Sequence, residues 1–165
     1  MIKNNPKVAI AMGSDSDYEI MKEAEDILKQ FGVEFQTSIV SAHRTPERMF
    51  EFAKSALDNG FKVIIAGAGG SAHLPGMISA LTVVPVIGVP IKSKTLKGLD
   101  SLYSIVQMPP GIPVATMAIN GSKNAALMAV QVLAINDQEL LRKIQGYRES
   151  LENTVLKKSS ELFGR

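Results

Sequence analysis

Residues 62–73 read KVIIAGAGGSAH, an apolar run that ends in a glycine-rich bend. The run Lys62–Ala66 carries apolar side chains at consecutive positions, which is typical of a strand buried on both faces. The bend Gly67–His73 follows and leads into a short predicted helix over residues 74–81. A strand, a glycine bend and a helix in this order predict one unit of a parallel α/β sheet.

The same alternation of strand and helix continues on both sides of this unit. Gly32 ends a predicted helix with apolar residues on one face, and Gly60 follows a second helix that Thr45-Pro46 opens. The apolar positions that we expect this second helix to bury are Met49, Phe50, Ala53, Ala56 and Leu57. The remaining predicted strands are residues 7–12, 33–40, 84–89 and 114–119, and a further helix is predicted over 99–106.

Five strands separated by helices predict an α/β fold, a three-layer sandwich in which helices cover both faces of a parallel sheet. The flavodoxin-like strand order 2-1-3-4-5 is the arrangement that we expect for five such units. We expect a single α/β domain over residues 1–165, with a core over 1–136 and a long C-terminal helix over 137–165.

The last two predicted helices indicate self-association. Residues 124–135 form a helix that is apolar on nearly all sides, so its outer face must be covered. We therefore expect a homo-oligomer, with the alternative that the C-terminal helix folds back onto its own domain. That helix carries a narrow apolar stripe suited to docking on a neighbouring helix: Leu140, Ile144, Tyr147, Leu151 and Val155.

Composition narrows the possible partners. A formal net charge of +2 and an aromatic content of 5% do not favour binding to nucleic acid. The chain has no cysteine and two histidines, so we expect neither disulfides nor a bound metal. No stretch is long and apolar enough to span a bilayer, and the apolar run near the amino terminus is too short for a signal peptide. We expect a cytoplasmic protein with no membrane partner.

Polar side chains collect in the loops that follow the first three predicted strands. In the expected strand order these loops lie side by side, at the edge where open parallel sheets bind ligands. The loops are Gly13–Asp17, Ser41–Thr45 within the sequence IVSAHRTP, and Gly67–His73. Both histidines of the chain, His43 and His73, fall in them.

Each of these residues also has a purely structural interpretation. Ser16 and Glu19 match a capping box, so Ser16 is expected to cap the helix that follows, and Thr45 to cap the next helix. Asp15 and Asp17 would then only stabilise the positive end of the first helix. The convergence of so many polar groups at one sheet edge nevertheless favours a ligand site.

The residue types in these loops suit an anionic ligand. Arg44 offers two parallel donors to phosphate or carboxylate, an aspartate accepts from hydroxyls, and a histidine exchanges protons near neutral pH. The glycines of the bend allow backbone N–H groups to face an anion. Residues 67–72 also fit the loose G-x-G-x-x-A dinucleotide pattern, but no acidic residue ends the next strand, and no P-loop motif is present. The site predicts proton transfer on a small phosphorylated substrate.

Several ungapped motifs occur in order: GSDSD, SAHRTP, AGAGGSAHLPGM, SLYSIVQMPPGIPVATMAI and NAAL. They closely resemble those of the class I N5-carboxyaminoimidazole ribonucleotide mutase family, the catalytic-subunit type of phosphoribosylaminoimidazole carboxylase in purine synthesis. Ser71 departs from the pattern, because alanine is common there. The resemblance implies a homo-octameric isomerase that needs no cofactor. Its reaction moves a carboxylate from the exocyclic nitrogen to ring carbon 4 of the aminoimidazole ribonucleotide.

The resemblance also implies roles for individual residues. His43 is the general acid and base, releasing carbon dioxide by protonating the carbamate nitrogen and later accepting the ring proton. His73 is expected to shape the glycine bend behind the site. The ribose phosphate is expected to be held by Ser14, Asp17 and Arg44. The other residues expected to bind the substrate are Ser41, Gly69, Gly70 and Ser71. The loops 41–45 and 92–98 are expected to cover the pocket.

Two alternatives remain open at this stage. The related aminoimidazole ribonucleotide carboxylase uses free carbon dioxide and shares the GSxSD and SAHR-type motifs, although the chain length and the wording of the motifs favour the mutase. The other alternative is a flavodoxin-like module that holds a nucleotide without catalysis. Such a module would not need His43 beside Arg44.

Overall fold

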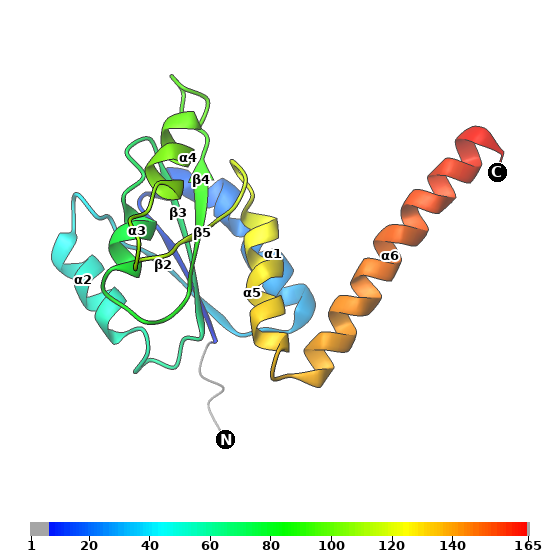
Figure 1. Ribbon diagram of the computed structural model, residues 1–165, viewed down its shortest axis with the longest axis horizontal. Helices are drawn as coiled ribbons and strands as arrows, with labels where there is room; N and C mark the ends of the chain where they lie inside the picture. Colours follow the sequence, from blue (N-terminus) through cyan, green and yellow to red (C-terminus); the bar gives the residue numbers. More distant parts are fainter. Residues whose placement is uncertain (1–6, 165) are drawn as a thin grey trace. The chain divides into compact units, whose positions relative to one another are not determined.

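The computed structural model describes residues 7–164 and contains the predicted five-stranded parallel sheet. The strand order β2-β1-β3-β4-β5 confirms the order expected from the sequence, and helices cover both faces of the sheet (Figure 1). All four strand pairs are parallel. The strands are β1 (Val8–Met12), β2 (Phe35–Ile39), β3 (Val63–Gly69), β4 (Val86–Ile91) and β5 (Ala115–Thr116).

The helices fall between and after the strands as the sequence predicts. The first of them ends at Gly32, whose φ of 70° is left-handed and whose N–H donates to the carbonyls of Leu28 and Lys29. A short 3-10 turn, η1, precedes it. The elements are η1 (Asp15–Asp17), α1 (Tyr18–Phe31), α2 (Pro46–Ser55), α3 (Leu74–Ser79), α4 (Leu99–Val106), α5 (Ser122–Ala134) and α6 (Gln138–Phe163).

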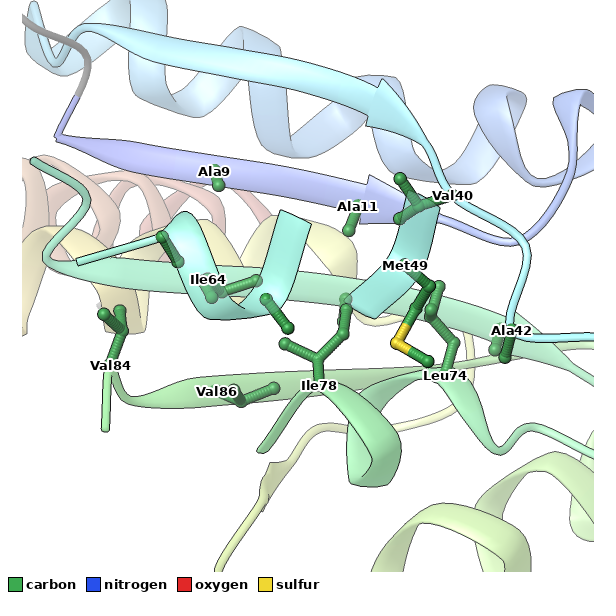
Figure 2. Close-up of a cluster of buried hydrophobic side chains, with 14 of the residues drawn as sticks. Ala9, Ala11, Val40, Ala42, Met49, Ile64, Leu74, Ile78, Val84 and Val86 are labelled. Atoms are coloured by element: carbon green, nitrogen blue, oxygen red, sulfur yellow. The ribbon is translucent and has the colours of Figure 1, made fainter. Parts of the chain in front are cut away.

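One face of the sheet packs against α2 and α3. Ala9, Ile64 and Val86 come from three neighbouring strands and form a buried cluster with Met49 of α2 and Leu74 of α3 (Figure 2). All of these side chains are at most 4% exposed. Because each fully buried aliphatic side chain contributes about 1.5 to 3 kcal/mol, this layer is a large part of the driving force for folding.

The opposite face of the sheet packs against α1. Successive residues of a strand point to opposite faces, so Ile10 and Ile65 lie on this second face and are also fully buried. Apolar residues therefore occupy both faces of the strands, which explains the continuous apolar runs in the sequence. The hydroxyl of Ser122 donates to the carbonyl of Ile20, so the first turn of α5 is held beside α1.

Gly67 of β3 lies directly under α1. A Cβ atom on this glycine would lie 2.4 Å from the sulfur of Met21, which is far inside van der Waals contact. The glycine therefore lets the strand approach the helix closely. This is a packing reason for Gly67, and it differs from the ligand-facing role that the sequence suggested.

The bounds of all five strands differ from their predictions by one to three residues, most at the ends of β3 and β5. The strand predicted to end at Ala66 runs on to Gly69, because Gly67 and Gly69 pair with Val89 and Ile91 of β4. Glycine has a low strand propensity, which is why these residues were predicted as a turn. The strand predicted over residues 114–119 contains only Ala115 and Thr116, which pair with β4 at the edge of the sheet.

The predicted helix caps were wrong for Ser16 and only partly right for Thr45. Ser16 lies inside η1, and Ser14 is the capping residue of that turn, its hydroxyl accepting from the Ser16 N–H. Thr45 occupies the N-cap position of α2, but its hydroxyl makes no capping bond. It is used instead within the turn that begins at Ser41.

The buried face of α2 is narrower than predicted. Met49, Ala53 and Ala56 are fully buried, as expected. Phe50 is 40% exposed and Leu57 is 52% exposed, so the prediction that both are buried is wrong for the chain as described. The apolar pattern cannot distinguish a face covered by the same chain from one that is left uncovered.

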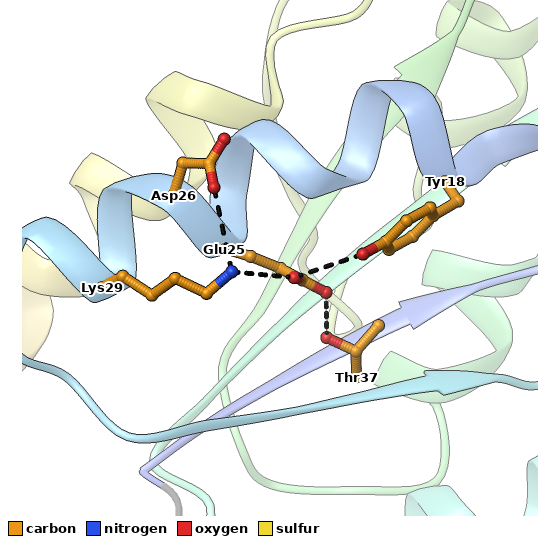
Figure 3. A network of polar contacts seen from close by, with 5 residues as sticks. All are labelled: Tyr18, Glu25, Asp26, Lys29 and Thr37. Atoms are coloured by element: carbon orange, nitrogen blue, oxygen red, sulfur yellow. Dashed lines mark hydrogen bonds and ion pairs between the residues drawn. The ribbon is translucent and has the colours of Figure 1, made fainter.

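A buried carboxylate joins α1 to the edge strand β2. Glu25 accepts from the hydroxyl of Thr37 across 2.7 Å and from Tyr18 across 3.5 Å (Figure 3). Lys29, one helical turn after Glu25, lies 3.4 Å from the same carboxylate and 3.8 Å from Asp26. The charge of Glu25 is thus compensated where α1 covers the strand.

The chain divides into two compact units, with the boundary between Ala129 and Val130 inside α5. The second unit contains α6, the long C-terminal helix that the sequence predicts. Asp137 caps α6 by accepting from the N–H groups of Glu139 and Leu140. Across residues 7–164, no helix has the length and apolar character to cross a bilayer. Residues 1–6, part of the segment assessed for a signal peptide, lie outside the described residues.

Candidate active site

A cavity of about 630 Å³ lies at the carboxyl ends of the first four strands. The strand register brings these ends together: Met12 lies beside Ile39 on one side and Gly67 on the other, and Gly69 lies beside Ile91. Ligands of open α/β sheets bind at this edge. All residues predicted to act on the substrate line the cavity: Ser14, Asp17, Ser41, His43, Arg44, Gly69, Gly70 and Ser71. His73, which was expected only to shape the glycine bend behind the site, lines it as well.

Arg44 is held by the loop after β1 and by its own loop. Its Nη2 donates to the carbonyl oxygen of Gly13 across 2.9 Å, and its backbone N–H donates to Ser41 Oγ across 3.2 Å. Thr45 closes the same turn, because its hydroxyl donates to the Ser41 carbonyl and accepts from the Ser41 N–H. The guanidinium is thus oriented by the protein and keeps further N–H groups for an anion.

Ser41, predicted to bind substrate, lines the cavity but is nearly buried. Its hydroxyl oxygen accepts from both the backbone N–H and the Nε of Arg44. The structure therefore shows Ser41 orienting the arginine. No sequence pattern predicts this contact, because a serine three residues before an arginine has many possible partners.

Two aspartates in the loop after β1 have opposite electrostatic surroundings. Asp17 is buried at the cavity wall, and this burial raises the pKa of its carboxyl above the ordinary value. Asp15 is exposed, and a hydrogen bond of 2.9 Å from the hydroxyl of Ser14 lowers the pKa of its carboxyl. Asp17 is the aspartate placed to accept from the hydroxyls of a ligand in the cavity.

The glycine bend uses most of its own N–H groups. Gly70 has a φ of 67°, in the left-handed region, and its N–H donates to Ser101 Oγ across 2.8 Å. The N–H groups of Ala72 and His73 donate to the carbonyls of Gly70 and Ser71. The expectation that the bend offers several N–H groups to an anion is therefore wrong for these positions. Within residues 70–73 of the described chain, only the Ser71 N–H has no partner.

Ser101 supports the bend from inside the protein, and sequence reasoning missed it. Its side chain is fully buried, and its hydroxyl donates to the carbonyl of Ile91 across 2.6 Å while accepting from Gly70. One hydroxyl thus joins the end of β4 to the bend after β3. A signal was present, because Ser101 lies one helical turn before the buried Ile105 on the apolar face of α4.

The two histidines of the chain contact each other. His43 Nε2 lies 2.8 Å from His73 Nδ1, a hydrogen-bond distance, and the ring planes are 89° apart. The loops after β2 and β3 are thereby joined across the cavity wall. The sequence predicted that both residues lie at this edge, but it did not predict the direct bond.

The loop after β4 completes the cavity wall with Lys92 and Lys94. Ser93 organises this loop: its hydroxyl donates to Asp100 across 2.7 Å and accepts from the N–H of Gly98. The sequence predicted that this loop covers the pocket, but it did not single out the two lysines. Together with Arg44 they make the surroundings favourable for an anionic ligand.

A smaller hollow of about 300 Å³ adjoins the cavity and shares Ser14, Ser41 and Arg44 with it. It adds a second guanidinium, that of Arg48, which the sequence reasoning did not consider. Among residues 7–164, no three histidine, aspartate or glutamate side chains are grouped so as to hold a metal ion.

A family model described as AIR carboxylase matches residues 7–154, which span the sheet, every residue of the cavity and most of α6. The chain belongs to the AIR carboxylase family. This membership confirms the resemblance that the sequence motifs showed.

Named relatives in the AIR carboxylase family include enzymes of two kinds. The N5-carboxyaminoimidazole ribonucleotide mutase of Saccharolobus solfataricus is 61% identical over 151 residues, which cover 92% of this chain and 96% of that protein. The mutase of Thermotoga maritima is 57% identical over 95% of this chain and 92% of that protein. The phosphoribosylaminoimidazole carboxylase of Candida albicans is 58% identical over 97% of this chain, which corresponds to 28% of that longer protein.

Solved structures of the AIR carboxylase family share the fold. Treponema denticola PurE2-S38D superposes with a TM-score of 0.87 at 31% identity, over 94% of this chain and 97% of that chain. Treponema denticola PurE gives a TM-score of 0.85 at 33% identity, over 94% and 98% of the two chains. The sheet order and the helices on both faces are therefore those of a known architecture.

Proposed function

We propose that this chain is an N5-carboxyaminoimidazole ribonucleotide mutase, an isomerase of de novo purine synthesis. The observation that carries the proposal is the family membership, together with relatives named as this mutase that are 57% and 61% identical over most of both chains. The reaction moves the carboxylate of the substrate from its exocyclic nitrogen to ring carbon 4. A cytoplasmic location is part of the proposal.

The cavity supports the recognition of a small nucleotide anion. Arg44 is oriented by Gly13 and Ser41 and keeps donors for the phosphate of the ribose phosphate. Asp17, which lines the same cavity, is proposed to accept from the ribose hydroxyls. Ser14, Gly69, Gly70 and Ser71 complete the proposed substrate contacts on the same wall.

His43 is the proposed proton carrier. An imidazole can exchange a proton near neutral pH, and His43 lines the cavity from the same loop as Arg44. In the first step, a proton from the His43 imidazolium reaches the carbamate nitrogen, and the bond from that nitrogen to the carboxylate carbon breaks to release carbon dioxide. In the second, ring carbon 4 attacks the carbon dioxide and neutral His43 accepts the proton that this carbon loses. His43 regains in the second step the proton that it gives in the first, so the two reaction steps need no cofactor and no other acid.

We further propose that the chain works as a homo-octamer, with residues 137–165 making contacts between copies. In the described chain, Leu151, Val155, Leu156 and Phe163 of α6 and Met128 of α5 are at least 38% exposed. Exposed apolar side chains of this kind favour association. Light scattering should give a mass of about 142 kDa, eight times the 17.8 kDa chain, and a monomer at micromolar concentration would refute this part.

The first alternative is an aminoimidazole ribonucleotide carboxylase that takes carbon dioxide from solution. One observation favours it, since the Candida albicans carboxylase is as similar to this chain as the named mutases are. A nucleotide-binding module without catalysis is the second alternative. Binding a nucleotide without catalysis would not require the contact between the two histidines at the cavity wall.

One experiment separates the three functions. The purified protein receives either the carbamate substrate or aminoimidazole ribonucleotide with bicarbonate, and ultraviolet absorbance follows the carboxylated product. Conversion of the carbamate without added bicarbonate identifies the mutase, and dependence on bicarbonate identifies the carboxylase. Absence of product with both substrates would refute an enzymatic function.

His43→Asn provides the matched control. It should abolish turnover while calorimetry still detects binding of the product, because His43 is exposed and the fold does not depend on it. Substantial residual turnover in this variant would contradict the proton-carrying role.

A further inference from the structure

The contact between His43 and His73 restricts where protons can sit. A hydrogen bond of 2.8 Å between His43 Nε2 and His73 Nδ1 has room for one hydrogen atom, so one nitrogen donates and the other accepts. An imidazolium carries hydrogen on both ring nitrogens. The two rings therefore cannot both be cationic while the contact persists, since two N–H groups would then face each other.

We propose that His73 is a positioning residue that accepts a hydrogen bond from His43 Nε2–H and thereby leaves His43 Nδ1 as the nitrogen that exchanges a proton with the substrate. The inference rests on the proposed function of His43 in one respect, the reaction itself. The direction of the hydrogen bond is a property of the protein alone and is measured without substrate.

This assignment lets the bond persist through both proton transfers. With His43 as imidazolium, Nε2–H donates to His73 and Nδ1–H faces the substrate. After the proton leaves Nδ1, His43 is neutral and still carries hydrogen on Nε2, so the bond is unchanged. The ring proton of the product then returns to Nδ1. His73 stays neutral throughout, with its own hydrogen on Nε2, and holds the catalytic ring in one tautomer and one orientation.

The structure supplies a rigid base for His73. Its backbone N–H donates to the Ser71 carbonyl across 2.8 Å, and its carbonyl accepts from Met77 in the first turn of α3. The bend just before it is fixed where Gly70 donates to the buried hydroxyl of Ser101. The loop of His43 is tied by the bonds of Arg44 to Ser41 and Gly13. Two independently braced loops thus present the two rings to each other.

The opposite arrangement is chemically possible and makes a different prediction. If His73 Nδ1–H donates, then His43 Nε2 is an acceptor, and neutral His43 carries its hydrogen on Nδ1. His43 could not then take a proton at Nδ1 while neutral, and the contact would have to break in every turnover. The direction of the bond therefore decides between a lasting support and a contact that opposes catalysis.

Nitrogen-15 NMR reads this direction, and the chain suits the method because it has two histidines. Untagged protein labelled in the imidazole rings is compared with His73→Phe and His73→Asn. In the unsubstituted protein with both rings neutral, we expect hydrogen on Nε2 of both rings. In His73→Phe, the His43 signals should shift toward a mixture of tautomers. Hydrogen on His73 Nδ1, or His43 signals unchanged by His73→Phe, would overturn the proposal.

Kinetics of the same variants test the effect on turnover. Loss of a hydrogen-bond partner behind a functional histidine typically costs about 10- to 100-fold, and we expect this fall in kcat for His73→Phe with KM changed less than about threefold. His73→Asn offers an amide oxygen near the former Nδ1 position and should recover most of the loss. Equal impairment of the two variants, with unchanged melting temperatures, would contradict a role through the hydrogen bond.

The two failures can be told apart. If the unsubstituted protein converts neither substrate, the proposed function fails, and the NMR result still decides the direction of the bond. If turnover is normal and the His73 variants match the unsubstituted protein, only the positioning role fails.

Discussion

The guanidinium of Arg44 donates to the carbonyl oxygen of Gly13 across 2.9 Å, which joins the loop after β2 to the loop after β1. These loops are far apart in the sequence but adjacent in the sheet, because β1 and β2 pair directly. The bond orients the arginine toward the cavity in advance of ligand binding. Preorganisation of this kind reduces the entropic cost of recognising an anion.

Arg44→Leu should weaken substrate binding because it removes a charge-assisted hydrogen bond. The expected loss is about 1.5 to 3 kcal/mol, or roughly 10- to 150-fold in KM, with a smaller change in kcat. Arg48→Leu is the matched control, since Arg48 lines only the adjoining hollow and should change KM less than about fivefold. Steady-state kinetics at low salt measures both. An unchanged KM in Arg44→Leu would rule out the anchoring role.

Ser101→Ala should destabilise the fold by about 1 to 3 kcal/mol, because it leaves the half-buried N–H of Gly70 and the carbonyl of Ile91 without their partner. Urea denaturation measures the change. Ser104→Ala is the control on the same helix, since its hydroxyl donates to the Asp100 carbonyl one turn earlier across 2.7 Å and reaches the Gly70 carbonyl of the bend only across 3.4 Å. We expect less than about 0.5 kcal/mol for that variant. Equal losses for the two serines would show that the bridge from β4 to the bend is unimportant.

Gly67→Ala should cost about 1 to 3 kcal/mol, because the new methyl group would overlap the sulfur of Met21. Shortening the helix residue in the double variant Met21→Ala, Gly67→Ala should make the two effects non-additive. Gly146→Ala is the opposite control: Gly146 lies in α6 with open space around it, so alanine should stabilise the helix by roughly 0.5 to 1 kcal/mol. Thermal unfolding measures the melting temperatures of these variants. An unchanged melting temperature in Gly67→Ala would contradict the packing explanation.

Asp17→Asn and Asp15→Asn should change stability with pH in opposite directions. Burial raises the pKa of Asp17 in the folded protein, so its ionised form costs stability once the pH rises above the ordinary value of about 3.9. Asparagine removes that cost, and Asp17→Asn should gain stability relative to the unsubstituted protein as the pH rises from about 3.9 through the raised pKa of Asp17. The lowered pKa of Asp15 has the reverse sign and a lower window: its stabilising contribution is present above the ordinary value of about 3.9 and is lost as the pH falls through the lowered pKa, so Asp15→Asn should lose stability relative to the unsubstituted protein as the pH rises through that acidic range. Parallel curves for the two variants would contradict these assignments.

The sheet and the position of the cavity could be predicted because they depend on local signals. Continuous apolar runs such as Lys62–Ala66 mark buried strands, and the order of strands fixes which loops meet. The loops Ser41–Thr45 and Gly67–His73 therefore had to converge once the order 2-1-3-4-5 was chosen. This is why every predicted site residue lies on one cavity.

Hydrogen-bond partners could not be predicted in the same way. Gly70 and Ser101 are 31 residues apart, and their contact depends on how α4 settles on the ends of β3 and β4. The capping box at Ser16 is a case in which a local motif misled, because the 3-10 turn capped by Ser14 begins the helical segment earlier. A local pattern reports what a residue is able to do, and the tertiary structure decides with which partner it does so.

The contact between Glu25 and Thr37 has a consequence for the alignment of the site. The strand β2, with the sequence FQTSI, is too polar for hydrophobic alternation to specify one register strongly. A shift of the register by one residue would turn Thr37 away from α1 and leave the buried carboxylate of Glu25 without this hydrogen-bond donor. This hydrogen bond between Thr37 and Glu25, at the edge of the sheet, therefore specifies the pairing register of β2. Ser41 lies two residues after the end of β2. A shift of β2 by one residue would therefore displace His43 and Arg44 by one residue relative to their hydrogen-bond partners.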